Sequence, residues 1–383
     1  MQTDFQTILN TASIPLHRHE QAYVDFPSSV FYSAISYAPQ SFAIFILEKL
    51  DVPTLLIYYG ARIMALLFWL VCAWYSIRIL PIGKWLFTLL ALLPMTVAAT
   101  NSLSADVVTN AISFLLIATC LRYAYTDKAF TVFSFFRVVL LGMMVASSKF
   151  VYAPLVLLIF LVPPKKFGSL TMQILKKVFF FVIILCTMLF WSKMSGNLYT
   201  AHVDYNPKYV EGLTLTKEGN MPLQIEYVKV HYVNMLVVFV HSFIKGIRMW
   251  GPGYIGTFGW LDTFLPWWLI LAGWFTILLV TKMDWAGREQ VLIRHKLIFI
   301  ACFLASVFLL LLSQYLTWEG VGSQLIYTIQ GRYFIPLFPL LFLCIPGSYQ
   351  PTGNGLKLAV AGFTIPALLI SCLVLYLRFF VPQ

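Results

Sequence analysis

The sequence predicts an all-α integral membrane protein with about ten transmembrane helices and with interfacial amphipathic helices in its external loops. Composition is the first reason: of 383 residues, 60% are hydrophobic, 17% aromatic and only 11% charged. A water-soluble surface needs far more charge than this. The second reason is that apolar segments of roughly 20 residues, the length that crosses a bilayer, recur along the whole chain. The third is that all six cysteines fall inside these segments, so no disulfide framework or CxxC metal pair is expected.

Eight segments are apolar and long enough to be predicted as full spans: 55–79, 83–100, 107–124, 130–147, 173–194, 264–283, 296–316 and 357–379. Two shorter segments flanked by proline, 150–163 and 333–347, are predicted as half-length helices surrounded by protein or a cavity rather than by lipid. Residues 29–50 and 224–245 have apolar and polar residues at helical spacing, which favours helices lying in the membrane interface.

The domain organisation follows from these segments. Residues 1–54 are predicted to form an external N-terminal loop with an interfacial helix, and residues 55–383 a single polytopic domain that includes an external loop at 195–263. The first 25 residues are polar, and nothing ahead of them could carry them across a membrane. A translocated N-terminal tail is one explanation; the other, which we favour, is a further span upstream of the given sequence.

Charge predicts the orientation in the membrane. Alternate threading places thirteen Lys/Arg on one face, together with only three acids, Asp127, Asp284 and Glu289. The positive-inside rule makes that face cytoplasmic and the chemically varied face external, in a multi-pass protein of the cell membrane. The bases gather at span ends, where they meet lipid headgroups. The bilayer is thus the expected partner, and nucleic acid is not.

Asp106 is the first candidate site residue. It follows Asn101 and Ser102 in a polar run at the external edge of a predicted span, with Thr109 one turn later. One interpretation is helix capping, in which Ser104 accepts from free backbone N–H groups and Asp106 complements the positive helix end. The other is a carboxylate facing a pocket, either as a general base or as the ligand of a divalent cation such as Mg²⁺ or Mn²⁺.

Lys149 and Arg332 are candidates for binding a lipid phosphate. Lys149 interrupts a nearly continuous apolar run, and a charge at such depth is a functional hypothesis by default, although snorkelling to the headgroups would also explain it. Arg332 begins a short span, where a guanidinium could either hold phosphate through two parallel hydrogen bonds or anchor the helix. Gly331 would let a headgroup approach the backbone, and the Tyr333 hydroxyl could add a hydrogen bond.

Three further residues are candidates for substrate binding. Trp260 and Asp262 close a glycine-rich stretch, and an aromatic residue beside an acid is common at sugar sites, although tryptophans also suit an interfacial belt. Gln330 precedes Arg332 by two residues and is grouped with it.

Five segments in order resemble a bacterial family of predicted polytopic membrane proteins catalogued as a domain of unknown function: YSAISYAPQ (32–40), LPMTVAATNSLSADVVTNAISFL (93–115), SSKFVYAPLVLLIFLVPPKK (147–166), GTFGWLD (256–262) and QGRYFIPLFPLL (330–341). That family is in turn similar to the GT-C glycosyltransferases, which take sugars from polyprenyl-phosphate donors outside the membrane. The resemblance implies sugar transfer from such a donor to a glycan, lipid or protein acceptor of the cell envelope.

The resemblance also implies roles for residues. Lys149 and Arg332 would hold the donor phosphate, and a carboxylate would deprotonate the acceptor. GT-C enzymes usually carry their catalytic acid just after the first span, and here Glu20 and Asp25 stand nearest to that place. Two alternatives stay open: a transporter or flippase for lipid-linked sugars, and a non-catalytic partner in glycopolymer assembly.

Overall fold

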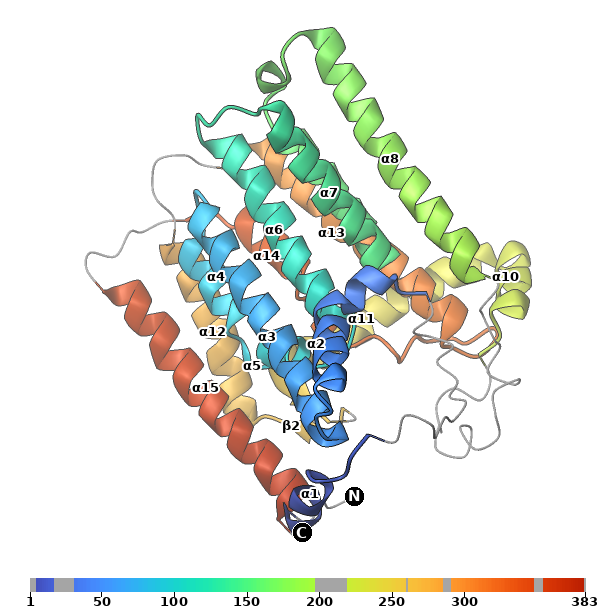
Figure 1. Ribbon diagram of the computed structural model, residues 1–383. Helices are drawn as coiled ribbons and strands as arrows, with labels where there is room; N and C mark the ends of the chain where they lie inside the picture. Colours follow the sequence, from blue (N-terminus) through green and yellow to red (C-terminus); the bar gives the residue numbers. More distant parts are fainter. Residues whose placement is uncertain are drawn as a thin grey trace.

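The part of the chain that the structure describes is a bundle of helices with one short β-hairpin (Figure 1). This computed structural model describes residues 5–16, 31–196, 219–259, 261–284, 291–347 and 354–381. Within these ranges, six helices are long and apolar enough to cross a membrane: α3 (Thr54–Ile79), α6 (Asp106–Tyr125), α8 (Leu170–Gly196), α11 (Tyr232–Gly256), α13 (Ile293–Thr317) and α15 (Gly355–Phe380). The predicted class, a multi-pass helical membrane protein, is confirmed at this level.

Three shorter apolar helices accompany them: α7 (Val132–Ser148), the 3₁₀ helix η2 (Phe150–Leu161) and α12 (Trp267–Met283). The predicted full span at 83–100 is wrong, because that segment forms two short helices, α4 (Lys84–Ala91) and α5 (Pro94–Thr100). Pro94 causes the break, since proline has no N–H to continue the ladder and clashes with the preceding turn.

The remaining elements are short. They are α1 (Phe5–Thr11), η1 (Ala34–Tyr37), α2 (Ala38–Lys49), η3 (Pro164–Phe167), α10 (Met221–Val230), β1 (Thr257–Phe258), β2 (Thr263–Phe264), η5 (Gly331–Phe334) and α14 (Phe338–Cys344). The predicted half-length helix at 333–347 is therefore divided between η5 and α14.

Helix α6 lies at the centre of the bundle and α8 at its margin. Of the most apolar window of α6, 83% is buried, against 11% for α8. Helix α6 packs against α3, α7 and η2, and Figure 1 shows α8 leaning away from the others. Small and polar residues along α6, including Thr109, Asn110 and Ser113, are buried against these neighbours, as is usual where membrane helices pack closely.

The two ends of the bundle differ in their polar contacts. At the Asp284 end, where α12 stops and α4 begins, the Leu86 N–H donates to Asp284 Oδ2 at 2.8 Å. Burial raises the pKa of Asp284 to about 6, even though the N–H groups of Leu86 and Trp85 and the charge of Lys84 act in the opposite direction. At the opposite end, which we call the Asp106 end, α6 begins and α7 stops.

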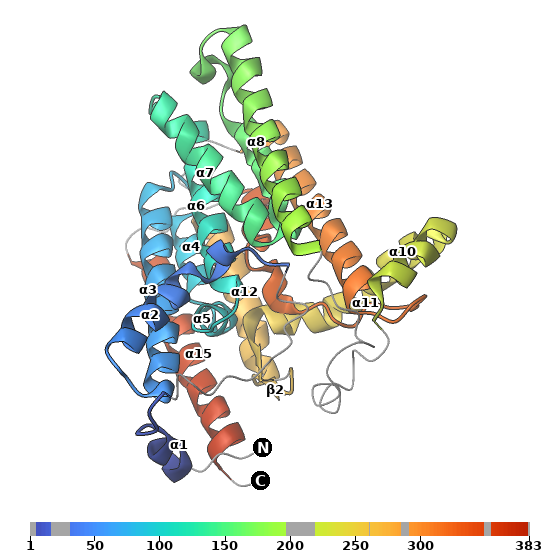
Figure 2. The same cartoon turned by 45° about the vertical axis from the view of Figure 1, so that its right-hand side comes forward.

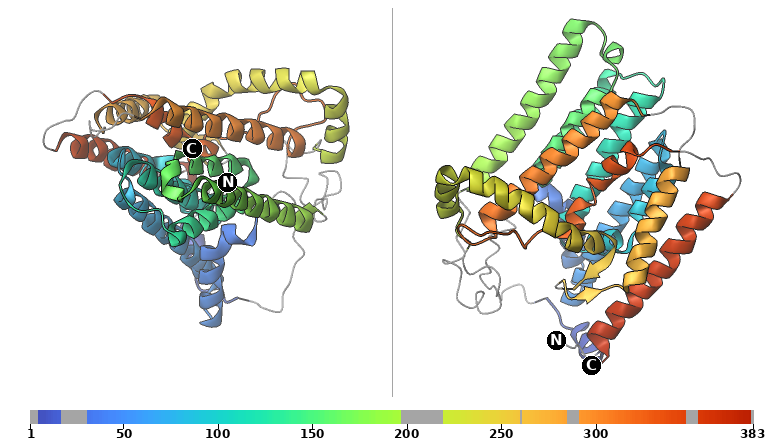
Figure 3. Two further views of the ribbon diagram at one scale, coloured as in Figure 1. Left: turned by 90° about the horizontal axis from the view of Figure 1, so that it is seen from above. Right: turned by 180° about the vertical axis from the view of Figure 1, so that it is seen from behind.

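The axis of helix α11 differs in direction from the axes of the other long helices. In Figures 2 and 3 it runs across the axes of α8 and α13, whereas the other long helices run roughly together. Its C-terminal part packs against η5 through Trp250 and Phe334, whose ring centroids are 5.1 Å apart. Helix α11 thereby brings the Arg332 segment to the Asp106 end.

Candidate functional site

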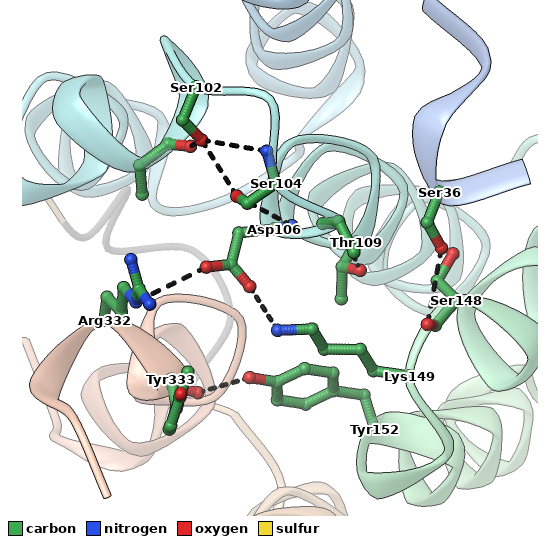
Figure 4. A network of polar contacts seen from close by, with 12 residues as sticks. Ser36, Ser102, Ser104, Asp106, Thr109, Ser148, Lys149, Tyr152, Arg332 and Tyr333 are labelled. Carbon is green, nitrogen blue, oxygen red and sulfur yellow. Dashed lines mark hydrogen bonds and ion pairs between the residues drawn. The ribbon is translucent and has the colours of Figure 1, made fainter. Parts of the chain in front are cut away.

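Four of the predicted site residues meet at the Asp106 end: Asp106, Lys149, Arg332 and Tyr333 (Figure 4). Asp106 and Arg332 are 226 positions apart in the sequence. The Lys149 ammonium forms an ion pair with Asp106 Oδ1, and Arg332 Nε lies 3.5 Å from Asp106 Oδ2. The Asp106 and Lys149 side chains are each 8% exposed, and that of Arg332 is 34% exposed. Tyr333 completes the group, which we call the Asp106 cluster.

The turn before α6 is held by α2 and α3. Gln40 of α2 donates to the Ser104 carbonyl at 3.3 Å, and Arg62 of α3 donates to the Asn101 carbonyl at 3.1 Å. Ser104 Oγ accepts from the Asp106 N–H at 3.3 Å, as the capping interpretation predicted, although the N-cap position of α6 itself is Ala105, which makes no side-chain cap bond. Arg62, a cation within a predicted span, therefore positions the turn that carries Asp106.

Lys149 stands at the break between α7 and η2, in extended conformation (φ −146°, ψ 111°). Its ammonium lies 4.8 Å from the ring centre of Tyr32 and 5.2 Å from that of Tyr333, which stabilises a cation held away from water. Lys149 therefore points into the protein and does not snorkel to the surface.

Gly331 explains how Arg332 is aimed. A Cβ atom at this position would lie 2.3 Å from the Gly253 carbonyl carbon and 2.5 Å from the Trp250 carbonyl oxygen. The backbone of η5 thus touches that of α11, and the expectation that Gly331 leaves room for a headgroup is wrong. Burial lowers the pKa of Arg332, but the Asp106 carboxylate and Tyr333 outweigh burial and raise it, so the guanidinium stays charged.

Beside the Asp106 cluster lies a cavity of about 470 Å³. Lys149, Tyr152 and Tyr333 line one part of it, and the side chains of α8 and α13 line another, among them Leu185 and Met188. Lys149 is the charged residue among the lining residues that the structure describes. A cavity with one cationic end and an apolar wall suits an amphiphile with an anionic head.

Sequence reasoning missed two tyrosines of this cavity. Tyr152 donates to the Tyr333 carbonyl at 2.8 Å and so fixes η5 against η2, while Tyr32 stacks on Lys149. Each had a signal in the sequence, because Tyr152 follows Lys149 by three residues and Tyr32 opens the Tyr-rich segment at 32–40.

Glu319 was missed as well. Its buried carboxylate accepts from the Tyr327 N–H at 2.7 Å, the Thr328 N–H at 3.1 Å and the Thr328 hydroxyl at 2.9 Å. These charge-assisted bonds fix the segment that leads to Arg332.

Other predicted residues lie elsewhere. Asp262, next to the β-hairpin, pairs with Arg378 of α15 at 2.7 Å and not with the Asp106 cluster. The Gln330 carbonyl accepts from the Tyr333 N–H at 3.1 Å, at the start of η5. Glu20, Asp25 and Trp260 fall outside the residues that the structure describes.

The surroundings of Asp106 do not fit the divalent cation considered above. One carboxylate oxygen faces Lys149 and the other faces Arg332, and two positive groups at these oxygens would repel a metal ion. Across the described ranges, no group of three His, Cys, Asp or Glu side chains could hold a metal ion. The carboxylate instead balances the two cations.

A search of curated proteins and a search of solved structures each gave no match. A family described as "Predicted membrane protein (DUF2142)" matches residues 1–341. Because the match covers most of the chain, and because the helices described above are those of a multi-pass membrane protein, the protein belongs to the DUF2142 family of predicted membrane proteins.

Proposed function

We propose that this protein is a GT-C-like membrane glycosyltransferase, which moves a sugar from a polyprenyl-phosphate donor to a cell-envelope acceptor on the outer face of the membrane. One observation carries the proposal: the 470 Å³ cavity joins Lys149 and three tyrosines to an apolar wall that includes α8. Since only 11% of the most apolar window of α8 is buried in the bundle, its cavity-lining face is next to where lipid would be. A polyprenyl chain could lie along that wall with its phosphate at Lys149.

Charge supports the orientation. Lys84 and Lys282 stand at the Asp284 end, at the start of α4 and in the last turn of α12, and Arg294 and Lys296 begin α13 there. By the positive-inside rule that end is cytoplasmic, which makes the Asp106 end external. A donor displayed on the outer leaflet would then meet the Asp106 cluster directly.

In the proposed reaction an acceptor hydroxyl oxygen attacks the anomeric carbon of the donor sugar. The new glycosidic C–O bond forms as the bond from that carbon to the phosphate oxygen breaks, and the electron pair leaves with polyprenyl phosphate. Lys149 and Arg332 stabilise the charge that grows on this leaving group. The hydroxyl proton passes to a carboxylate, for which Asp25 and Glu20 are the candidates.

Asp106 has a different part in this scheme. Its carboxylate holds both cations at one place before the donor arrives, because two unpaired cations so close together would repel each other. It is therefore a positioning residue and not the base.

The rival function is binding or transport of a lipid-linked sugar without transfer, either as a flippase or as a non-catalytic partner. One observation favours it: no carboxylate is found among the cavity-lining residues that the structure describes. A binding protein needs the cations and the apolar wall but no base.

Sugar transfer in membranes that contain the full chain, from labelled polyprenyl-phosphate sugars, tests the proposal. Arg332→Gln should lower transfer by about 10²-fold, the usual loss when one charge-stabilising donor is removed. Arg378→Gln is the matched control, because its side chain is similarly exposed (32% against 34%) and also pairs with an aspartate. Equal transfer by both variants would contradict the proposal. Labelled lipid crossing between leaflets with no transfer would establish the transporter.

A further inference from the structure

Helix α11 carries three distinct faces. Met235, Val238, Phe239 and Ser242 of one face are buried in the bundle. A second face is apolar yet exposed: Leu236 is 46% exposed, Val237 59%, Val240 62%, Ile244 63% and Ile247 54%. A third face, next to the second around the helix, is polar and exposed, and its members are His241, Lys245 and Arg248. An exposed apolar stripe beside a basic stripe is the pattern of a helix lying in a membrane interface.

An extended segment follows α11 along its length. The Gly322 N–H donates to Gln224 of α10 at 2.9 Å, the Ile326 N–H donates to Ser242 at 3.0 Å, and Gly331 touches Gly253. From Ser242 to Gly253 the helix rises about 17 Å. Five extended residues, from 326 to 331, also span about 17 Å. The segment and the helix therefore run side by side in the same direction.

This pairing decides how α11 sits in the membrane. Non-helical backbone that faces hydrocarbon is not tolerated, and this segment is open on one side, where Tyr327 is 61% exposed, so it does not cross the lipid core. The segment connects the end of α13 to the start of η5. Both of these points are at the Asp106 end, so the two ends of the segment lie on one side of the membrane. Although α11 is long and apolar enough to span, it is tied to a segment that stays at the surface.

We propose that α11 lies flat in the membrane interface at the Asp106 end and binds anionic phospholipid headgroups through Lys245 and Arg248. The second face enters the boundary of the acyl chains, and the basic stripe meets the headgroup phosphates. This site is separate from the Asp106 cluster and does not depend on sugar transfer.

Nitroxide labels measure the depth of the helix. Labels are placed on cysteines at Val233, Val240 and Ile247 of the full chain in phosphatidylcholine vesicles with phosphatidylglycerol, with the exposed Cys186 and Cys372 replaced by serine. We expect one shallow depth at all three positions. Labels at Val178, Leu185 and Met194 of α8 should give a profile deepest at Leu185. A deep maximum at Val240 flanked by shallow ends would mean that α11 spans, and would overturn the proposal.

Photoactivatable phosphatidylglycerol, with the reactive group on the headgroup, tests the lipid. Crosslinks to α11 should fall by roughly fivefold for each base removed in Lys245→Gln and Arg248→Gln. Crosslinks at the Asp284 end serve as the internal control and should not change. If photoactivatable phosphatidylcholine labels α11 equally well, or if the double variant is labelled like the wild type, α11 has no anionic-lipid site.

Discussion

The ion pair between Asp106 and Lys149 makes a quantitative prediction about stability. Replacing Asp106 with asparagine leaves the shape almost unchanged but removes the charge that both cations face. Arg332 is one-third exposed and can turn to water, whereas Lys149 is 8% exposed and cannot. Breaking a buried pair by removing one partner costs about 3–5 kcal/mol, so Asp106→Asn should lower the free energy of unfolding by that amount, nearly all of it through Lys149.

The double variant isolates the cause. If Asp106→Asn destabilises the fold because it leaves the Lys149 ammonium unpaired, then adding Lys149→Met should restore about 2 kcal/mol or more of the unfolding free energy. The reason is that replacing a buried pair by apolar groups is often nearly neutral. Asp262→Asn is the control, since its pair with Arg378 is about one-third exposed on both sides and should cost no more than about 1 kcal/mol.

Reversible unfolding by dodecyl sulfate in mixed micelles, followed by circular dichroism, gives the four free energies. Two results would refute the reasoning. One is a loss below about 1 kcal/mol for Asp106→Asn. The other is a double variant that is less stable than Asp106→Asn, which would mean that Lys149 stabilises the fold through its contacts with the rings of Tyr32 and Tyr333 and not through its pair with Asp106.

Three further predictions rest on contacts described above. Gly331→Ala should cost about 1–3 kcal/mol in unfolding free energy, because the new Cβ meets backbone that cannot move aside; Gly362→Ala, with nothing within 4 Å of its Cβ, should be neutral or slightly stabilising. The raised pKa of Asp284, about 6, means that the folded state favours the protonated carboxyl. The wild type should therefore lose about 1–3 kcal/mol relative to Asp284→Asn as the pH rises from 4 to 8 in an unfolding titration, and a difference that stays constant with pH would exclude this effect. Glu319→Gln should weaken its two bonds to backbone amides by about 1–3 kcal/mol, seen as faster hydrogen exchange at Tyr327 and Thr328 with no change in α15.

Much of the bundle could be predicted from hydropathy alone. The predicted spans at 55–79 and 107–124 agree with α3 and α6 to within a residue or two. Hydropathy failed at 83–100, where Pro94 splits one apolar run into two helices. The short helix predicted at 150–163 is present as η2, but its 3₁₀ form was not predicted. For α11 the two sequence criteria disagree: its length and composition suit a span, whereas the alternation of apolar and polar residues at 224–245 favours an interfacial helix.

The candidate site was predictable residue by residue, but its assembly was not. Asp106, Lys149 and Arg332 each stood out as a polar group at a membrane edge. The Asp106 carboxylate faces both Lys149 and Arg332 only because α6, η2 and η5 pack together, and these elements lie far apart in the sequence. The role of Gly331 was misjudged for the same reason, since the helix it touches could not be known.

The deep burial of α6 has a consequence for how the protein is made. Most of its surface is covered by other helices, and it carries Asp106 together with buried threonine and asparagine side chains. A helix with this surface is costly to release into lipid by itself. We therefore expect α6 to leave the insertion machinery paired with α3, which precedes it. Its Asp106 carboxylate would then be neutralised once α7 and η2 are made, because Lys149 stands at the junction between these two helices. Biogenesis of this protein would then depend on the order in which partners arrive, and less on the hydropathy of each helix alone.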